Sequence, residues 1–402
     1  MEAVAEVTQV VAEAIVSNKD KDSKPRVFLC YNKRRGDSMK PQCLQKGDKV
    51  AIVSLSRGLL GEPFIAHELE LGLKRLEELG LVPVIMPNAL KGMKYLANHP
   101  EDRASDLKEA FKDDSIKGII TAIGGGDTFK LVPYLMEDEE FKELVKTKPK
   151  IFMGFSDTTN NHLLLNRLGL STFYGPAIIT DFAELDTEML PYTKEYIDKL
   201  FTTDPYEITS SPVWYEERTD FSKDAVGTPR IAHKETHGFE TLNGNGIVTG
   251  NLYGGCIESI YDYFTGERYP EEKEIYEKYP IFATEEELKE KILFIETCEE
   301  KMKPETLERD LIEFKKRNIL SSVKGIIVGK PMDEAYYDEY KEVYKRVFSD
   351  LNTPVLFNVN FGHATPRTIL PYDAEVTVDY DNKKITINSP ILEKGEEYVK
   401  QR

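Results

Sequence analysis

Residues 153–159 read MGFSDTT and place a serine where it could act as a nucleophile. The apolar run before it, residues 151–154, predicts a buried strand, and the stretch after it predicts a helix. A sharp strand-to-helix turn would push the side chain of Ser156 outward and direct the next backbone N–H, that of Asp157, toward a developing oxyanion. The usual hydrolase turn has glycine two residues after the serine, where this chain has Thr158. A simple helix cap is therefore the alternative interpretation.

Three consecutive glycines, Gly124, Gly125 and Gly126, follow another apolar run at residues 118–123. Glycine lets the backbone approach a ligand closely and can point N–H groups at an anion. We predict that the N–H of Gly125 or Gly126 completes an oxyanion hole with that of Asp157. Neither GxGxxG nor GxxxxGK[ST] occurs, so the sequence does not indicate a dinucleotide or P-loop site. A tight turn without a ligand is the alternative.

A serine nucleophile needs a general base, and the chain contains six histidines. His363 differs from the others because it follows an apolar strand and precedes a turn that contains Pro366, where an imidazole can be held at a cleft. Two histidines are predicted on helices, with packing or surface roles, and three lie in polar, irregular stretches. These five are His67, His162, His99, His233 and His237.

A carboxylate should orient the imidazole and stabilise its protonated form. Glu296 ends the apolar run KILFIE at residues 291–296, which places an acid at the edge of a buried sheet. The alternative is a strand-end charge that faces water, like the neighbouring Glu299 and Glu300. The predicted catalytic triad is therefore Ser156, Glu296 and His363.

The elements around the serine alternate between strand and helix. Such alternation predicts an α/β fold with a parallel sheet, in a domain that covers residues 44–185. The predicted strands begin after residue 46 and at residues 82–86, 118–123, 151–154 and 172–174, and the predicted helices cover residues 65–79, 104–112 and 158–168.

A second domain is predicted over residues 236–402, after a proline-rich and charged linker at residues 186–235. Structureless connections of that length are uncommon, which favours a functional role for the linker. The run TVDYDNKKITI predicts a closing hairpin around an Asp-Asn turn. The other strands are predicted at residues 246–252, 291–296, 325–328, 355–358 and 374–378, with a helix at residues 304–317.

Composition excludes several classes of function. A chain of 402 residues favours two domains with a cleft between them. The net charge of −17 would repel a phosphate backbone, so nucleic acid is excluded as a partner. No apolar stretch approaches the roughly 20 residues of a membrane span, so no membrane association is expected.

The four cysteines show no CxxC spacing, and no Cys/His zinc pattern occurs. Reduced thiols in a cytoplasmic protein without a metal are the simplest interpretation. The first 17 residues lack the basic start and apolar core of a signal peptide. We expect residues 1–43 to be a flexible extension, and Met39 as the true start is a second hypothesis for it.

Several segments together resemble the serine peptidase family that includes LD-carboxypeptidases and the microcin C self-immunity protein. The resemblance extends in order over most of the chain. The segments that carry it are LQKGDKVAIVS, AIGGGDT, FMGFSDTT, TFYGPA, GNLYGG, ILFIETCEE and FGHATPRTILP. GGGDT and TFYGPA look nearer to the microcin-immunity branch, whereas Cys256 stands where we expect asparagine.

The resemblance implies a Ser-Glu-His triad at Ser156, Glu296 and His363. It also implies a first domain like the class I glutamine amidotransferases, a second swivelling β/β/α domain that carries the Glu and His, and a homodimer. The implied activity is cleavage of an amide bond through an acyl-enzyme, without a cofactor, in a small peptide or an aminoacyl-nucleotide.

Two alternatives to this enzyme stay open. One is a catalytically silent protein that sequesters a peptide or nucleotide-peptide. The other is an amidotransferase-like module, which would need cysteine at position 156. For the substrate itself, Arg367 could bind a carboxylate. Trp214, Tyr253 and the Phe173-Tyr174 pair could stack on a nucleobase.

Overall fold

A computed structural model describes residues 38–395 of the chain. The first half of these residues builds a sheet with the strand order β14-β5-β4-β3-β1-β2. Its strands β1 to β5 pair in parallel, and β14 joins β5 in the antiparallel direction. The strands are β1 (Lys49–Val53), β2 (Val82–Ile85), β3 (Ile116–Thr121), β4 (Ile151–Gly154), β5 (Phe173–Tyr174) and β14 (Leu370–Pro371).

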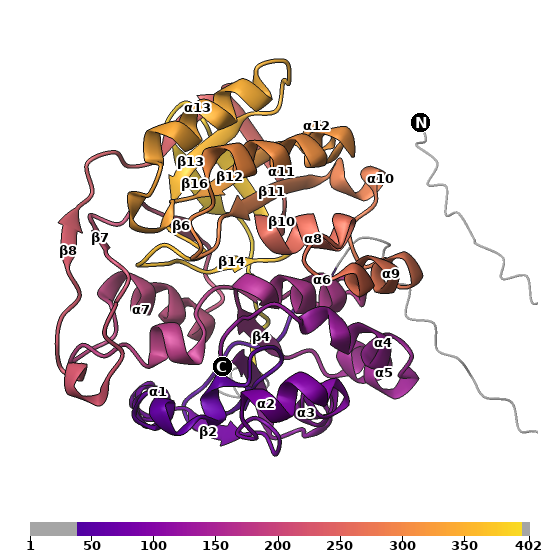
Figure 1. Ribbon diagram of the computed structural model, residues 1–402, viewed down its shortest axis with the longest axis vertical. Coiled ribbons are helices and arrows are strands. Elements are labelled where there is room, and N and C mark those ends of the chain that lie inside the picture. The colour runs from indigo at the N-terminus through magenta and orange to yellow at the C-terminus, as the bar shows by residue number, and fades with distance from the viewer. Residues whose placement is uncertain (1–37, 396–402) are drawn as a thin grey trace, which may run out of the picture. The chain divides into compact units, whose positions relative to one another are not determined.

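Helices surround this first sheet, in the indigo to magenta part of Figure 1. Strands β1 and β4 are buried along almost their whole length, as parallel strands covered on both faces must be. The helices are α1 (Ala66–Glu78), α2 (Met93–Asn98), α3 (Pro100–Lys112), α4 (Val132–Met136), α5 (Glu139–Thr147), α6 (Thr159–Arg167) and α7 (Pro191–Asp198).

The second sheet has the order β6-β16-β15-β10-β11-β12-β13-β9. Its centre, β10 to β13, is parallel, and antiparallel strands extend it on both sides. The strands are β6 (Tyr206–Ile208), β9 (Glu240–Asn243), β10 (Ile247–Cys256), β11 (Lys291–Glu296), β12 (Gly325–Gly329), β13 (Val355–Val359), β15 (Glu375–Asp379) and β16 (Lys384–Ile387).

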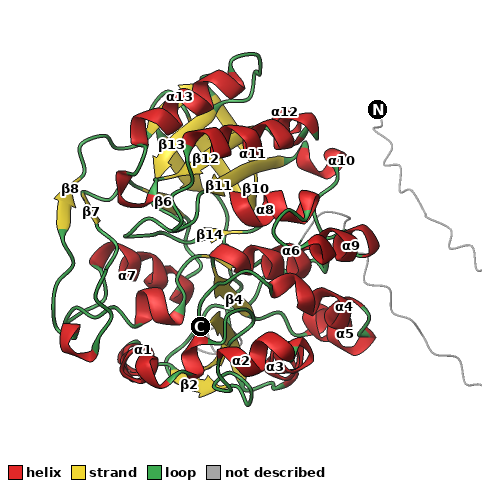
Figure 2. Cartoon of the chain, viewed as in Figure 1, coloured by secondary structure: helices red, strands yellow, loops and turns green. Residues whose placement is uncertain are grey.

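Six helices follow β10 in the chain, and Figure 2 shows α11, α12 and α13 lying across the second sheet. The amphipathic α11 buries Leu307, Leu311 and Phe314, residues three or four positions apart that share one face of the helix. The helices are α8 (Ile257–Thr265), α9 (Pro270–Lys278), α10 (Glu285–Leu288), α11 (Pro304–Lys316), α12 (Ile319–Ser322) and α13 (Tyr337–Phe348). The mixed α/β fold with a parallel first sheet is therefore confirmed.

The segment predicted as a linker has more structure than we expected. Besides α7, it contains β6, which pairs with β16 at the edge of the second sheet, and a hairpin of β7 (Val213–Tyr215) and β8 (Ala232–Lys234). In the reverse direction, β14 comes from the C-terminal part of the chain and extends the first sheet. Each sheet thus includes a strand from outside its own predicted domain.

Residues 38–43, which we expected to belong to a flexible extension, are bonded to the rest of the protein. Met39 donates its N–H to the carbonyl of Gly169, and Cys43 donates to Glu393, so residues from 38 onward pack against the rest of the protein. Residues 1–37, the remainder of the predicted extension, lie outside the described residues. Within residues 38–395, no helix is long and apolar enough to cross a membrane.

Candidate active site

Ser156 lies at the carboxyl end of β4, where the chain turns into α6. Its φ angle is +64°, in the left-handed region that a serine seldom adopts. Such a conformation costs about 1–3 kcal/mol and occurs mainly where a function requires it. Gly124 passes so close that a Cβ atom there would lie 2.7 Å from the Cβ of Ser156. The glycine turn and the serine turn therefore meet, as the sequence predicted.

Asp157 ties together the loops that follow β1, β3 and β4. Its buried carboxylate accepts hydrogen bonds from the hydroxyls of Ser56 and Thr128, both at 2.6 Å. It also accepts from the N–H of Thr128 at 3.0 Å and from the side-chain amide of Asn160 at 3.0 Å. These bonds occupy the side chain and hold the backbone around Ser156 in place.

The structure distinguishes between the predicted oxyanion donors. The N–H of Gly126 donates to the Ser56 hydroxyl at 3.2 Å and is already in use. Within the described chain, the N–H groups of Gly125 and Asp157 make no hydrogen bond. Gly125 and Asp157 therefore offer the unpaired N–H groups beside Ser156.

Glu296 and His363 meet at the carboxyl ends of β11 and β13. The imidazole Nδ1 lies 2.8 Å from Oε2 of Glu296, and the backbone N–H of His363 donates to the same oxygen at 3.1 Å. Gly362 has a φ angle of +77°, and a Cβ atom there would lie 2.3 Å from Cδ of Glu296. Only glycine permits this approach, which explains the Gly-His pair in the sequence.

Tyr174 on β5 connects the serine turn to this acid. Its hydroxyl donates to Oε1 of Glu296 at 2.6 Å and accepts the N–H of Ser156 at 3.1 Å. Burial and the charge of Glu296 raise the pKa of Tyr174 well above its usual value, so the hydroxyl stays a donor. The sequence suggested Tyr174 only as an aromatic surface, because a hydroxyl contact across 122 residues leaves no local signal.

Glu299 contacts Nε2, the ring nitrogen of His363 that faces away from Glu296. Its Oε2 lies 3.1 Å from Nε2, whereas no described contact joins Nε2 to Ser156. Burial lowers the pKa of His363, but the charges of Glu296 and Glu299 outweigh it and raise the pKa to about 10. The same hydrogen bond lowers the pKa of Glu299 to about 2. With a carboxylate at each ring nitrogen, the imidazole is held as a cation, and it must lose the proton on Nε2 to become a base.

His162 supports the turn from behind and has no role in the cavity. It is fully buried, with Nδ1 2.8 Å from the hydroxyl of Thr172 and Nε2 2.9 Å from the carbonyl of Gly154. Burial lowers the pKa of this imidazole to about 3, so it stays neutral. It fixes the end of β4, which is a packing role like the one the sequence suggested.

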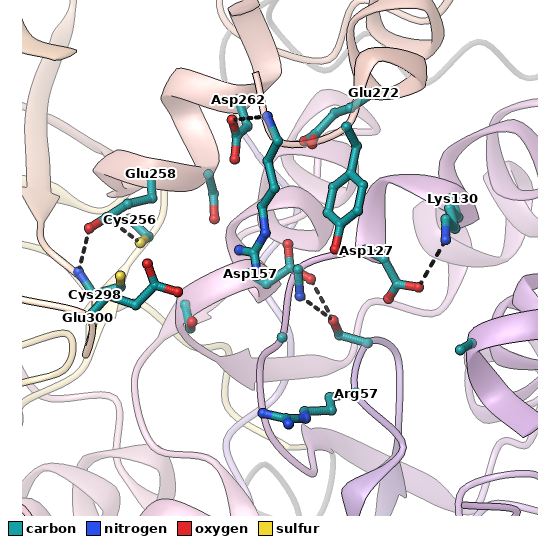
Figure 3. Close-up of a pocket in the computed structure, with 18 of the residues that line it drawn as sticks. Arg57, Asp127, Lys130, Asp157, Cys256, Glu258, Asp262, Glu272, Cys298 and Glu300 are labelled. Atoms are coloured by element: carbon teal, nitrogen blue, oxygen red, sulfur yellow. Dashed lines mark hydrogen bonds and ion pairs between the residues drawn. The ribbon is translucent and has the colours of Figure 1, made fainter. Parts of the chain in front are cut away.

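Ser156 lines two cavities. The larger, of about 490 Å³, lies toward Gly125, Gly126 and the helices α8 and α9, and Figure 3 shows the side chains around it. The smaller, of about 150 Å³, contains His363 and Glu299. A third cavity of about 260 Å³ shares Ile123, Thr180 and Glu217 with the smaller one and has a mainly apolar lining.

Within residues 38–395, one group of side chains has donor atoms close enough together to hold a metal ion. It consists of Cys256, Glu296 and His363, all of them buried. Burial and the nearby acid Glu258 raise the pKa of the Cys256 thiol well above its usual value, which keeps it protonated and a poor ligand. The Glu296 carboxylate already accepts three hydrogen bonds. These atoms are better explained as parts of a hydrogen-bonded network.

The three residues suggested for substrate binding lie in different surroundings. Arg367 lines the smaller cavity, but its guanidinium forms an ion pair with Asp181 at 3.3 Å. Trp214 stacks on His233 with a ring separation of 4.2 Å and lines none of the three cavities described above.

Tyr253 is buried in the core, where its hydroxyl accepts the N–H of Ala283. It cannot stack on a ligand in this position. It belongs to β10, whose alternating side chains the sequence could not assign to a cleft face or a core face.

Comparison with known proteins agrees with this architecture. The LD-carboxypeptidase N-terminal domain matches residues 50–175, and the LD-carboxypeptidase C-terminal domain matches residues 249–378. The microcin C7 self-immunity protein MccF of Escherichia coli is 28% identical over 74% of this chain and 81% of its own length. The probable murein peptide carboxypeptidase of Bacillus subtilis is 27% identical over 88% and 96%, respectively.

Solved structures include similar proteins with bound nucleotides. A MccF-like protein from Streptococcus pneumoniae in complex with AMP is 46% identical, with a TM-score of 0.81 over 85% of this chain and 99% of that one. MccF in complex with aspartyl sulfamoyl adenosine is 25% identical, with a TM-score of 0.72 over 88% and 100%. The N-terminal and C-terminal domain matches occur in order along the chain, and the solved relatives share its two-domain architecture. This protein therefore belongs to the LD-carboxypeptidase family.

Proposed function

We propose that this protein is a serine hydrolase that cleaves the amide bond of an aminoacyl or peptidyl nucleotide, with Ser156, Glu296 and His363 as its catalytic triad. The observation that carries the proposal is the strained serine beside two unpaired N–H groups, with His363, which is bonded to the buried Glu296, lining the smaller of the two cavities that Ser156 lines. Family membership supports a hydrolase, because the related proteins include carboxypeptidases.

The reaction is an acyl transfer in two steps. Neutral His363 takes the proton of Ser156, whose oxygen attacks the amide carbonyl, and the N–H groups of Gly125 and Asp157 stabilise the oxyanion. His363 then gives its proton to the leaving nitrogen, and the acyl group stays on Ser156. Water, activated by the same imidazole, hydrolyses the ester. Glu296 orients the ring and stabilises its positive charge in both steps.

The position of His363 determines which cavity receives the leaving group. The general acid must reach the leaving nitrogen, so the leaving group lies in the smaller cavity with His363 and extends into the apolar cavity. Phe64 and Phe221 have partly exposed rings there and can stack on a purine. Arg57 is exposed between the cavities and suits a phosphate or sulfamoyl group.

Structural neighbours support a nucleotide in the leaving group. One was solved with AMP and others with aspartyl sulfamoyl adenosine and glutamyl sulfamoyl guanosine. In this proposal the apolar cavity takes over the stacking role that the sequence suggested for Trp214 and Tyr253. Homodimer formation stays a prediction.

A hydrolysis screen tests the proposal. Purified protein is incubated with aminoacyl-sulfamoyl-adenosines and with a murein LD-tetrapeptide, and products are followed by mass spectrometry, with Ser156→Ala as the control. We expect release of sulfamoyl-adenosine by the wild type alone. Release of D-Ala from the tetrapeptide, without action on the adenylates, would place the enzyme in the carboxypeptidase branch. If an adenylate binds tightly but is not hydrolysed, and a fluorophosphonate does not label Ser156, the sequestering alternative is favoured.

A further inference from the structure

The larger cavity beside Ser156 has a strongly acidic lining. Seven of its lining residues are acids and three are bases, so acids outnumber bases around it within the described chain. The acids are Asp127, Asp157, Glu258, Asp262, Glu272, Glu299 and Glu300, and the bases are Arg57, Lys130 and Arg268. A cavity with this lining attracts cations and repels phosphate or carboxylate groups.

Part of this negative charge is already balanced by the protein. Asp127 pairs with Arg103 at 2.7 Å and with Lys130 at 3.4 Å. The Glu258 carboxylate accepts the N–H of Cys298 at 3.0 Å and contacts the thiol of Cys256 at 3.0 Å. These contacts, of which Figure 3 draws those to Lys130, Cys256 and Cys298, explain why Asp127 and Glu258 are stable without a ligand.

Glu272 on α9 has no such stabilising partners among the described residues. Its side chain is only 3% exposed and lines the cavity, and no hydrogen bond or ion pair to it exists among the described residues. Figure 3 shows it on the same side of the cavity as Asp262 of α8. Burial, together with the charges of Asp157 and Asp262, raises the pKa of Glu272 to about 9, whereas the charge of Arg268 lowers it. Asp262, whose pKa burial also raises, accepts only the backbone N–H of Arg268.

Arg268 offsets this pair of acids only at longer range, where its charge lowers the pKa of both. Its guanidinium lies against Gly126, where a Cβ atom would be 2.8 Å from Cζ, and over the ring of Tyr269 at 5.6 Å. It forms no ion pair within 4.0 Å in the part of the chain that the structure describes. A ligand carboxylate bound to Arg268 is therefore the competing possibility, and the experiment below distinguishes the two.

The larger cavity receives the acyl part of the substrate, because the leaving group lies on the side of His363. We propose that Glu272 and Asp262 bind a cationic group, an ammonium or guanidinium, carried by the acyl part of the substrate. This inference deepens the proposed function, on which the orientation of the substrate rests. It differs from the acidic aspartyl and glutamyl groups of the ligands solved with MccF.

Equilibrium binding tests the cation site without any turnover. Lysinamide and norleucinamide differ only by the ε-ammonium, and each is titrated into the full-length protein by calorimetry, with glutamic acid 1-amide as the anionic counterpart. We expect lysinamide to bind at least tenfold more tightly than the other two. Equal affinities for lysinamide and norleucinamide, or a preference for glutamic acid 1-amide, would overturn the proposal, and the latter would assign the cavity to Arg268.

Variants then locate the site. Glu272→Gln keeps the shape of the side chain and breaks no hydrogen bond, so we expect a folded protein that loses most of the preference for lysinamide. Asp262→Asn should reduce it as well. Glu274→Gln is the matched control, because Glu274 is exposed on the same helix and outside the cavity. A preference that survives both Glu272→Gln and Asp262→Asn, with melting temperatures near that of the wild type, would refute the assignment.

Hydrolysis separates this proposal from the proposed function. Values of kcat/KM are compared for lysyl- and norleucyl-sulfamoyl-adenosine, and we expect the lysyl compound to be favoured at least tenfold. Selective binding of lysinamide without cleavage of either adenylate would support the cation site and contradict the proposed function. Equal cleavage of both adenylates, with no preference for lysinamide, would leave the hydrolase standing and contradict the cation site.

Discussion

Removing the charge of Glu299 should lower the pKa of His363, so that the imidazole becomes a neutral base at lower pH. In the structure Glu299 contacts Nε2 of His363 and, with Glu296, raises the pKa of the imidazole. A general base must be neutral, so activity should rise with pH as His363 loses its proton. Glu299→Gln removes one of the two charges that hold this proton, and the acid limb of the pH profile should therefore move to lower pH.

The size of the shift follows from the geometry. The two charged atoms lie 3.1 Å apart, and the Glu299 side chain is 62% exposed, so water screens the pair. In a water-like dielectric, unit charges at that distance interact by about 1.3 kcal/mol, which corresponds to about one pKa unit. Glu299→Gln should thus shift the limb down by about one pH unit and raise the rate below it by about tenfold.

A reactive probe measures this without knowledge of the substrate. The rate of Ser156 labelling by a neutral fluorophosphonate is recorded against pH for the wild type and for Glu299→Gln. Glu300→Gln is the matched control, because it removes the same charge one residue later and Glu300 has no described contact with His363. Identical pH profiles for the wild type and Glu299→Gln would show that Glu299 does not control the protonation of His363.

Three further changes test other parts of the site. Ser156→Ala should reduce turnover by about 10⁴-fold or more while the circular dichroism spectrum stays native, and residual activity close to wild type would exclude this nucleophile. Tyr174→Phe removes a hydroxyl that bonds both Glu296 and the N–H of Ser156, so urea unfolding should show a loss of about 1–3 kcal/mol and kcat should fall with it. Activity should be unchanged by EDTA, since the buried thiol of Cys256 is protonated; loss with EDTA and recovery with zinc would contradict this.

Local sequence patterns predicted much of the fold and pointed to the proposed catalytic residues. The run KILFIE coincides with β11, and residues 151–154 coincide with β4, because buried parallel strands must be almost wholly apolar. The hairpin of β15 and β16 also forms as its turn residues predicted. Ser156 and His363 were proposed as catalytic residues because each follows such a strand, where parallel sheets present their functional loops.

Other residues gave no local signal because their roles depend on contacts between distant segments. Glu299 looks like an ordinary exposed acid beside Glu300, and only the return of the chain at His363 makes it a partner of the imidazole. Residues 206–208 are too short to stand out as a strand, and β16 makes them one by pairing with them. Tyr253 has an aromatic ring that could stack on a ligand, yet its position on β10 directs the side chain into the core.

The sequence by itself determined most of the buried strands and amphipathic helices, and which serine, acid and histidine follow them, since hydrophobic periodicity and turn chemistry act over a few neighbouring residues. Only the tertiary structure decided what surrounds the serine. The acids of the larger cavity come from α8, α9 and loops that lie far apart in the chain. Whether such acids are balanced by a partner or left unpaired, as Glu272 is, depends on burial and distance, which no short stretch of sequence encodes.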